Sequence, residues 1–213
     1  LAAADVVRDI TGSKTVNPVG YCIGGTLLAM TLVVSALTAG FAMVSNAPPL
    51  HFIVVLGGYF GLLFLTNALR NSVWGLASVF ALTAFMGYTL GPLLNFYIGA
   101  FSNGSQMVMM AFGGTAAIFL GLSGYALSTR KNFSFMGGFL MAGLIVALIA
   151  IVANLFLQIP LLSLVISAVV VMLMCGCILY ETSRLIHDGN ANPVFIVVSL
   201  FSSFIVLFSH LLN

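Results

Sequence analysis

The segment Val165–His187, VISAVVVMLMCGCILYETSRLIH, decides the fold of this protein. It begins as a continuous apolar run that is long enough, as a helix, to cross a bilayer. Near its end it carries Glu181 and Arg184, about one helical turn apart. Glu181 is the only acidic residue within any apolar run of the chain. Because a carboxylate in hydrocarbon is costly, an acid in such a helix indicates a functional site with a partner close by.

The composition indicates an integral membrane protein. Apolar residues make up 62% of the 213 residues and charged residues only 5%, whereas charged residues make up about a quarter of a soluble globular chain. Mean hydropathy is +1.22. The net charge is +2, without a long basic run, so we expect the lipid bilayer as the surrounding medium and no nucleic-acid partner. A single membrane domain is expected.

Seven apolar stretches predict an all-α, seven-transmembrane-helix bundle with a short last helix. The membrane domain is expected over residues 20–213, after a polar N-terminal segment, residues 1–19, that is a candidate for a segment of foreign origin. In the second stretch, Gly57 and Gly61 have the four-residue spacing that allows close helix packing. The predicted spans are residues 21–44, 50–69, 73–97, 106–127, 133–157, 161–186 and 194–212.

The positions of the lysines and arginines predict the orientation of the bundle. All six lie before the first span, after the second or fourth, or at the exit of the sixth. The turns after spans one, three and five contain none. Since cytoplasmic loops are enriched in Lys and Arg, we expect a cytoplasmic N-terminus, seven crossings and a C-terminus outside.

The sequence leaves two interpretations of Glu181 open. In the first, Glu181 is an interfacial acid that pairs with Arg184 and reaches towards water. In the second, Glu181 is a proton- or cation-responsive carboxylate in the interior of the bundle, where desolvation would raise its pKa and Arg184 would lower it. Polar residues on other spans that could hydrogen-bond it are Asn95, Asn154, Ser202 and Ser203.

A helix break or kink is expected at Gly91 and Pro92 in the third span. Proline removes a backbone N–H donor and crowds the preceding turn. In a membrane such a position is tolerated where neighbouring helices or a water-filled cavity satisfy the freed carbonyl. Both a packing kink and a pore-lining break fit the sequence.

We expect no metal site, no cofactor and no catalytic centre. Cys175 and Cys177 are two residues apart, so on a helix their side chains point to nearly opposite sides. His51 and His210 lie near span ends, where interfacial anchoring is the simpler role. Residues 20–25, GYCIGG, match a nucleophile-elbow pattern with Cys22 in the nucleophile position, but the sequence offers no soluble α/β core for such a turn.

Two resemblances to known families extend these observations. Residues 5–30, DVVRDITGSKTVNPVGYCIGGTLLAM, resemble the nucleophile region of polyhydroxyalkanoate synthases, which suggests a fusion or graft and keeps a Cys22 acyl-transfer enzyme as a remote alternative. From about residue 28 to the end, the chain resembles the Bax inhibitor-1 family, especially its bacterial inner-membrane branch. The second resemblance is carried by GYTLGPLLNFYIGA (87–100), STRKNFSFMGGFLMAG (128–143), VANLFLQIP (152–160) and ILYETSRLIH (178–187).

The Bax inhibitor-1 resemblance implies two functions. The bacterial branch is associated with the membrane-anchored AAA protease FtsH and its regulators, so it implies a non-enzymatic modulator of membrane-protein quality control. Some members conduct a pH-sensitive calcium leak gated by two carboxylates, of which the first aligns with Glu181 and the second with Ser203. Because Ser203 carries no charge, a shared-proton carboxylate pair is not expected here. A calcium or proton leak that uses Glu181 is therefore the alternative function.

Overall fold

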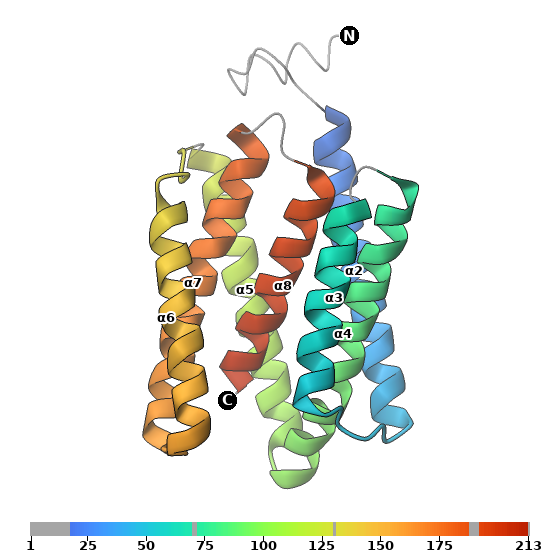
Figure 1. Cartoon of the computed structure of the whole chain (residues 1–213), viewed down its shortest axis with the longest axis vertical. Coiled ribbons are helices and arrows are strands. Elements are labelled where there is room, and N and C mark those ends of the chain that lie inside the picture. The colour runs from blue at the N-terminus through green and yellow to red at the C-terminus, as the bar shows by residue number, and fades with distance from the viewer. Residues whose placement is uncertain (1–17, 70–71, 130, 188–191, 213) are drawn as a thin grey trace. The chain divides into compact units, whose positions relative to one another are not determined.

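The computed structural model describes residues 18–69, 72–129, 131–187 and 192–212, and within these ranges the chain forms seven α-helices and no strands (Figure 1). Each predicted span begins and ends within three residues of a helix boundary. The predicted N-terminal segment, residues 1–19, lies almost wholly outside the described residues. The helices are α2 Pro18–Val44, α3 Phe52–Leu69, α4 Val73–Ala100, α5 Gly104–Thr129, α6 Met136–Leu157, α7 Pro160–His187 and α8 Pro193–Leu212.

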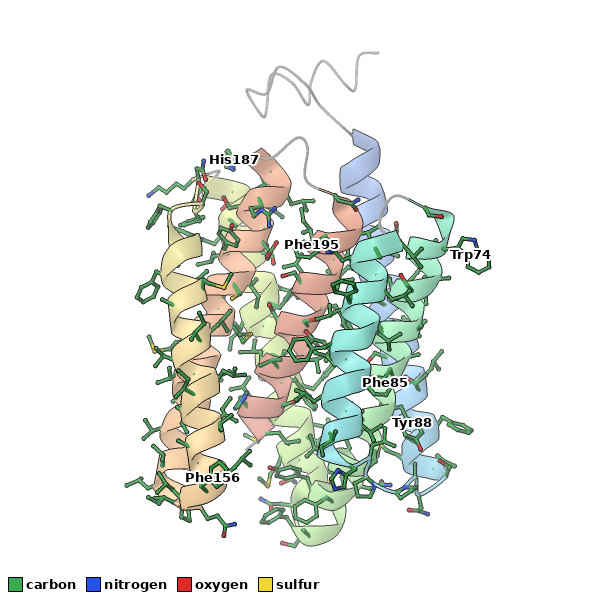
Figure 2. All side chains as sticks on the ribbon, in the orientation of Figure 1. Trp74, Phe85, Tyr88, Phe156, His187 and Phe195 are labelled. Atoms are coloured by element: carbon green, nitrogen blue, oxygen red, sulfur yellow. The ribbon has the colours of Figure 1, made fainter. Side chains whose placement is uncertain are left out.

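Six of the seven described helices are long and apolar enough to cross a membrane, and α3 is the shorter exception, with an apolar stretch at Ile53–Leu69. Many large apolar side chains lie on the outside. Trp74 is 72% exposed and Phe156 is 84% exposed, and Trp74 points away from the ribbon in Figure 2. In a bilayer such side chains meet lipid tails, so their exposure costs no hydrophobic free energy.

The described helices form two compact units. The described part of the first unit consists of α2, α3, α4, the start of α5 and the first half of α8 to Phe201. The second contains α5 from Met109, α6, α7 and the rest of α8 from Ser202. The division falls within α5 and α8, so no loop or change of composition marks it in the sequence.

In the first unit, α4 packs closely against α2 through two glycines. A Cβ atom at Gly87 would overlap Thr38 and the backbone of Ser35, and one at Gly91 would overlap Ala42. Gly87 and Gly91 are four residues apart, so they form the small-residue ridge that lets two membrane helices approach. The first half of α8 joins the same unit, where buried Val198 packs with Val79 and Leu82 of α4.

The close packing that the sequence predicted for α3 is wrong. Both Gly57 and Gly61 are exposed, and a Cβ atom on either would have nothing within 4 Å. The contact is made instead by Gly58, whose added Cβ would meet the ring of Phe85 on α4. A four-residue spacing selects one face of a helix, but it does not say whether that face meets protein or lipid.

In the second unit, α6 and α7 form an antiparallel hairpin (Figure 1). Gln158 ends α6 in the left-handed conformation, with φ 50°, and its N–H donates to the Asn154 carbonyl at 2.8 Å. Glycines again set the approach of the two helices, because Gly143 faces Leu173 and Gly176 faces Leu140. The second half of α8 contacts α5 through aromatic rings: Phe204 makes edge-to-face contacts with Phe112 and Phe119.

Candidate functional site

Glu181 lies six residues before the end of α7 and is only 7% exposed. The next two residues, Thr182 and Ser183, are also buried, at 4% and 1% exposure. Three consecutive residues point in three directions around a helix. Their common burial therefore shows that this end of α7 is enclosed on more than one side.

The predicted partner of Glu181 is in place. Arg184 Nη1 lies 3.7 Å from Glu181 Oε2, an ion-pair distance that is longer than an ordinary hydrogen bond. The guanidinium also lies 5.7 Å from the ring centroid of Tyr180, in a cation–π contact. The carboxylate side chain is 9% exposed, whereas the Arg184 side chain is 29% exposed. The pair thus joins a buried anion to a cation that is in part accessible.

Ser183 fastens the loop between α5 and α6 to the end of α7. Its hydroxyl donates to the Lys131 carbonyl at 3.2 Å and accepts from the Phe133 N–H at 3.0 Å. Since the Ser183 side chain is buried, both bonds are shielded from water. Sequence reasoning did not find this role, although the run of three polar residues at the end of an apolar helix was a usable signal.

Two further hydrogen bonds complete the arrangement at this end of the unit. The hydroxyls of Thr182 on α7 and Ser123 on α5 lie 3.4 Å apart. His187 Nδ1 lies 3.0 Å from the Ser183 carbonyl in the last turn of α7. Thr182 and Ser183 therefore connect α7 to α5 and to the α5–α6 loop, while Glu181 pairs with Arg184 within α7. We call Glu181, Thr182 and Ser183 the α7 polar end.

Asn154 does not belong to the α7 polar end. The α6–α7 hairpin turns at Gln158, so Asn154 is level with the first turn of α7, and Glu181 lies about 18 residues further along, or about 27 Å. Its Oδ1 atom is buried and accepts no hydrogen bond from a described residue. Asn95, in the other unit, donates to the Met43 carbonyl at 3.0 Å. The expectation that Asn154 could hydrogen-bond Glu181 is therefore wrong.

Ser203 is buried, at 5% exposure, but it is not level with Glu181. The contact between His210 Nδ1 and Ser167 Oγ, at 3.1 Å, fixes α8 alongside α7. Ser203 lies seven residues before His210 on α8, and Met174 lies seven residues after Ser167 on α7. Ser203 is therefore level with Met174. Glu181 is a further seven residues away, or about 10 Å. Ser203 therefore does not supply a carboxylate partner for Glu181, either chemically or by position.

The expected helix break at Gly91 and Pro92 is not present. The α4 helix continues through both residues to Ala100. One missing N–H removes a single helical hydrogen bond, and the close packing of Gly91 against Ala42 supports the helix at that point. A pore-lining break is therefore not supported, and Pro92 lies within an intact helix.

The structure gives no support to a catalytic or metal centre in the described residues. Cys22 lies in the first turns of α2, after helical residues 18–21, and not at a turn between a strand and a helix. Its side chain lies outside the described part of the chain. Among the residues that are described, no three His, Cys, Asp or Glu side chains are close enough to hold a metal ion. Cys175 and Cys177 are free thiols.

Comparison with known proteins gives a consistent result over most of the chain. Residues 26–213 match the family described as "Inhibitor of apoptosis-promoting Bax1" (Bax1-I). The chain is 47% identical over 187 residues to "Modulator of FtsH protease YccA" of Escherichia coli, which covers 88% of this chain and 84% of that protein. With the same coverage of both chains, it is 50% identical to an uncharacterized protein of Pseudomonas aeruginosa.

A membrane protein of Vibrio cholerae is 39% identical to this chain over 188 residues, covering 88% of this chain and 84% of its own length. The family match includes all of the α7 polar end and begins after Cys22. The comparisons give no support to the resemblance of residues 5–30 to polyhydroxyalkanoate synthases.

Proposed function

Because this chain belongs to the Bax inhibitor-1 family, we propose that it is a non-enzymatic modulator of an FtsH-type membrane protease. The chain is a multi-pass inner-membrane protein: its relatives include proteins named as inner-membrane and membrane proteins, and six of its described helices can span a bilayer. The observation that carries the proposal is the 47% identity, over most of both chains, to a protein named as a modulator of FtsH.

The proposed topology has all seven helices crossing the membrane, with the N-terminus in the cytoplasm and the C-terminus outside. Lys131 and Arg184 support it, because the bonds of Ser183 bring the Lys131 backbone to the end of α7 that carries Arg184. Cationic residues at one end of the unit fit the cytoplasmic side. The α3 helix, with 18 residues, is at the lower limit of about 17 residues for a span.

Within this function we assign the protease contact to the α5–α6 loop. Lys131 and Asn132 are exposed there, while the backbone on either side is held by Ser183. A loop that is already ordered loses little conformational entropy when it binds. Because Lys131 is cationic, the partner surface that fits it would be acidic. Charges at the rim of an interface act mainly by steering association.

The experiment is a proteoliposome assay with a purified FtsH-type protease and a membrane-protein substrate. We expect the full chain to co-purify with the protease and to slow degradation of the substrate. Lys131→Glu should weaken both effects several-fold, whereas Asn103→Glu, which introduces the same acidic side chain on a turn proposed to lie outside, should not. An unchanged degradation rate in the presence of the parent chain would overturn the proposed function.

A second candidate function is a cation or proton leak through the second unit, favoured by the burial of Glu181 beside Arg184. Ion flux in liposomes decides it, by comparing the parent with Glu181→Gln between pH 5 and 8, with calcium and with monovalent ions. Flux that disappears in the variant would support the leak. Absence of flux in both folded proteins would leave Glu181 as the structural partner of Arg184. Association with the protease should be the same in both proteins if modulation does not depend on this charge.

A further inference from the structure

A pocket of about 620 Å³ lies in the first unit beside the connection from α2 to α3. That connection is at the lower right of Figure 1. Its volume falls in the range of about 300–1,000 Å³ that is usual for small-molecule sites. The walls come from the loop after α2, the first turn of α3 and the second half of α4. They include Asn46, Leu50, Val55, Pro92, Asn95 and Phe96.

The pocket exists because α3 is short. The α3 and α4 helices have 18 and 28 residues and are separated by only three residues in the sequence, so α4 extends about ten residues, or about 15 Å, beyond the start of α3. The α2 helix ends level with Asn95, whose Nδ2 donates to the Met43 carbonyl. The loop between α2 and α3 must therefore return along α4 before α3 can begin, and this loop leaves part of the α4 surface uncovered.

The polar side of the pocket offers hydrogen-bond acceptors. The α2 helix ends in a Schellman motif: Asn46 has φ 47°, its N–H donates to the Met43 carbonyl, and the Ala47 N–H donates to the Ala42 carbonyl. These bonds use the backbone N–H groups of Asn46 and Ala47. The Asn95 amide nitrogen also donates to the Met43 carbonyl, which leaves the Asn95 carboxamide oxygen as an acceptor.

Pro92, which lines the pocket, leaves a second acceptor next to it. A proline has no N–H, so the helix supplies no donor four residues after Tyr88 for the Tyr88 carbonyl. Figure 2 labels Tyr88 in the same part of α4. Of the other lining residues, Leu50, Val55 and Phe96 are apolar, the Thr89 hydroxyl already donates to the Met86 carbonyl at 2.7 Å, and none is charged. The best ligand is therefore amphiphilic, with an apolar tail and a head that donates hydrogen bonds without requiring a charged partner.

We propose that this pocket binds one phospholipid of the surrounding membrane, with an acyl chain along Leu50, Val55 and Phe96. The headgroup, which carries N–H or O–H donors, lies at the Asn95 oxygen and the Tyr88 carbonyl. In hydrocarbon an uncovered backbone carbonyl is costly, and a lipid headgroup with donors satisfies it. Phosphatidylethanolamine has such donors, whereas phosphatidylcholine, whose ammonium is fully methylated, has none.

The first test fills the pocket. Val55→Trp places an indole in it, and Val54→Trp, at a neighbouring position that is 52% exposed, is the matched control. Native mass spectrometry of the purified full chain, after stepwise removal of lipid, measures retention of phosphatidylethanolamine. The parent and Val54→Trp should retain one molecule, and Val55→Trp several-fold less. Equal retention in the two variants, or no retained lipid in the parent, overturns the proposal.

The second test asks whether the headgroup is recognised, and it does not depend on the folding of Val55→Trp. The parent should retain phosphatidylethanolamine several-fold better than phosphatidylcholine. Pro92→Ala restores an N–H donor for the Tyr88 carbonyl, so it should reduce this preference, whereas Pro160→Ala at the start of α7 should not. No preference in the parent, or a preference that Pro92→Ala leaves unchanged, contradicts recognition through the freed carbonyl.

Discussion

The α2–α4 contact and the α7 polar end are held together by different physical means. The first is a close approach of helices at Gly87 and Gly91, where small side chains face each other and Asn95 makes one hydrogen bond across the interface. The second consists of an ion pair, a cation–π contact and the two bonds of Ser183. In lipid, where burial of apolar surface between helices brings little gain, packing and polar contacts are the remaining sources of affinity.

The largest effect is expected from Gly87→Leu in the packed contact. The new side chain would meet Thr38 and the Ser35 backbone, so α2 and α4 must separate, at a cost of about 3 kcal/mol. Gly61→Leu is the control, because nothing lies within 4 Å of a Cβ at that position. The unfolding midpoint in detergent measures the difference. Equal loss of stability in the two variants would show that close packing does not hold this contact.

A smaller effect is expected from Ser183→Ala in the polar end. It removes two hydrogen bonds and leaves the Phe133 N–H without its acceptor, a loss of about 1–2 kcal/mol. We expect faster amide hydrogen exchange in the peptide that contains the α5–α6 loop. Ser128→Ala, on an exposed residue that bonds only to the Tyr125 carbonyl, provides the baseline. If exchange in the loop is the same in both variants, Ser183 does not order it.

The smallest effect is expected from Asn95→Leu, which tests whether a polar bond matters where packing dominates. The variant loses the bond to the Met43 carbonyl, and such bonds between membrane helices contribute about 0.6 kcal/mol on average. The same unfolding measurement should detect a small decrease in stability. Asn103→Leu, at an exposed turn of the same unit, is the comparison. A loss as large as that of Gly87→Leu would remove the contrast between the two regions.

The candidate site was only partly predictable. Glu181 and Arg184 were found because an acid in an apolar run is rare and because residues three apart share a helix face. Ser183 was missed, since nothing local to the sequence shows that a hydroxyl on α7 meets a loop some 50 residues earlier. Asn154 and Ser203 were placed near Glu181 on polarity alone, although their distances depend on helix direction and level.

The sequence by itself determined the membrane class, the seven helices and their approximate ends, because the length and hydrophobicity of each stretch are local properties that the bilayer selects. It also indicated Glu181 and the family. Only the tertiary structure decided which glycines are packed, as Gly87 and Gly91 are and Gly57 and Gly61 are not, since that depends on which face of a helix meets another. It also decided that α4 continues through Pro92 and that Ser183 holds a loop, because both follow from contacts between residues distant in the chain.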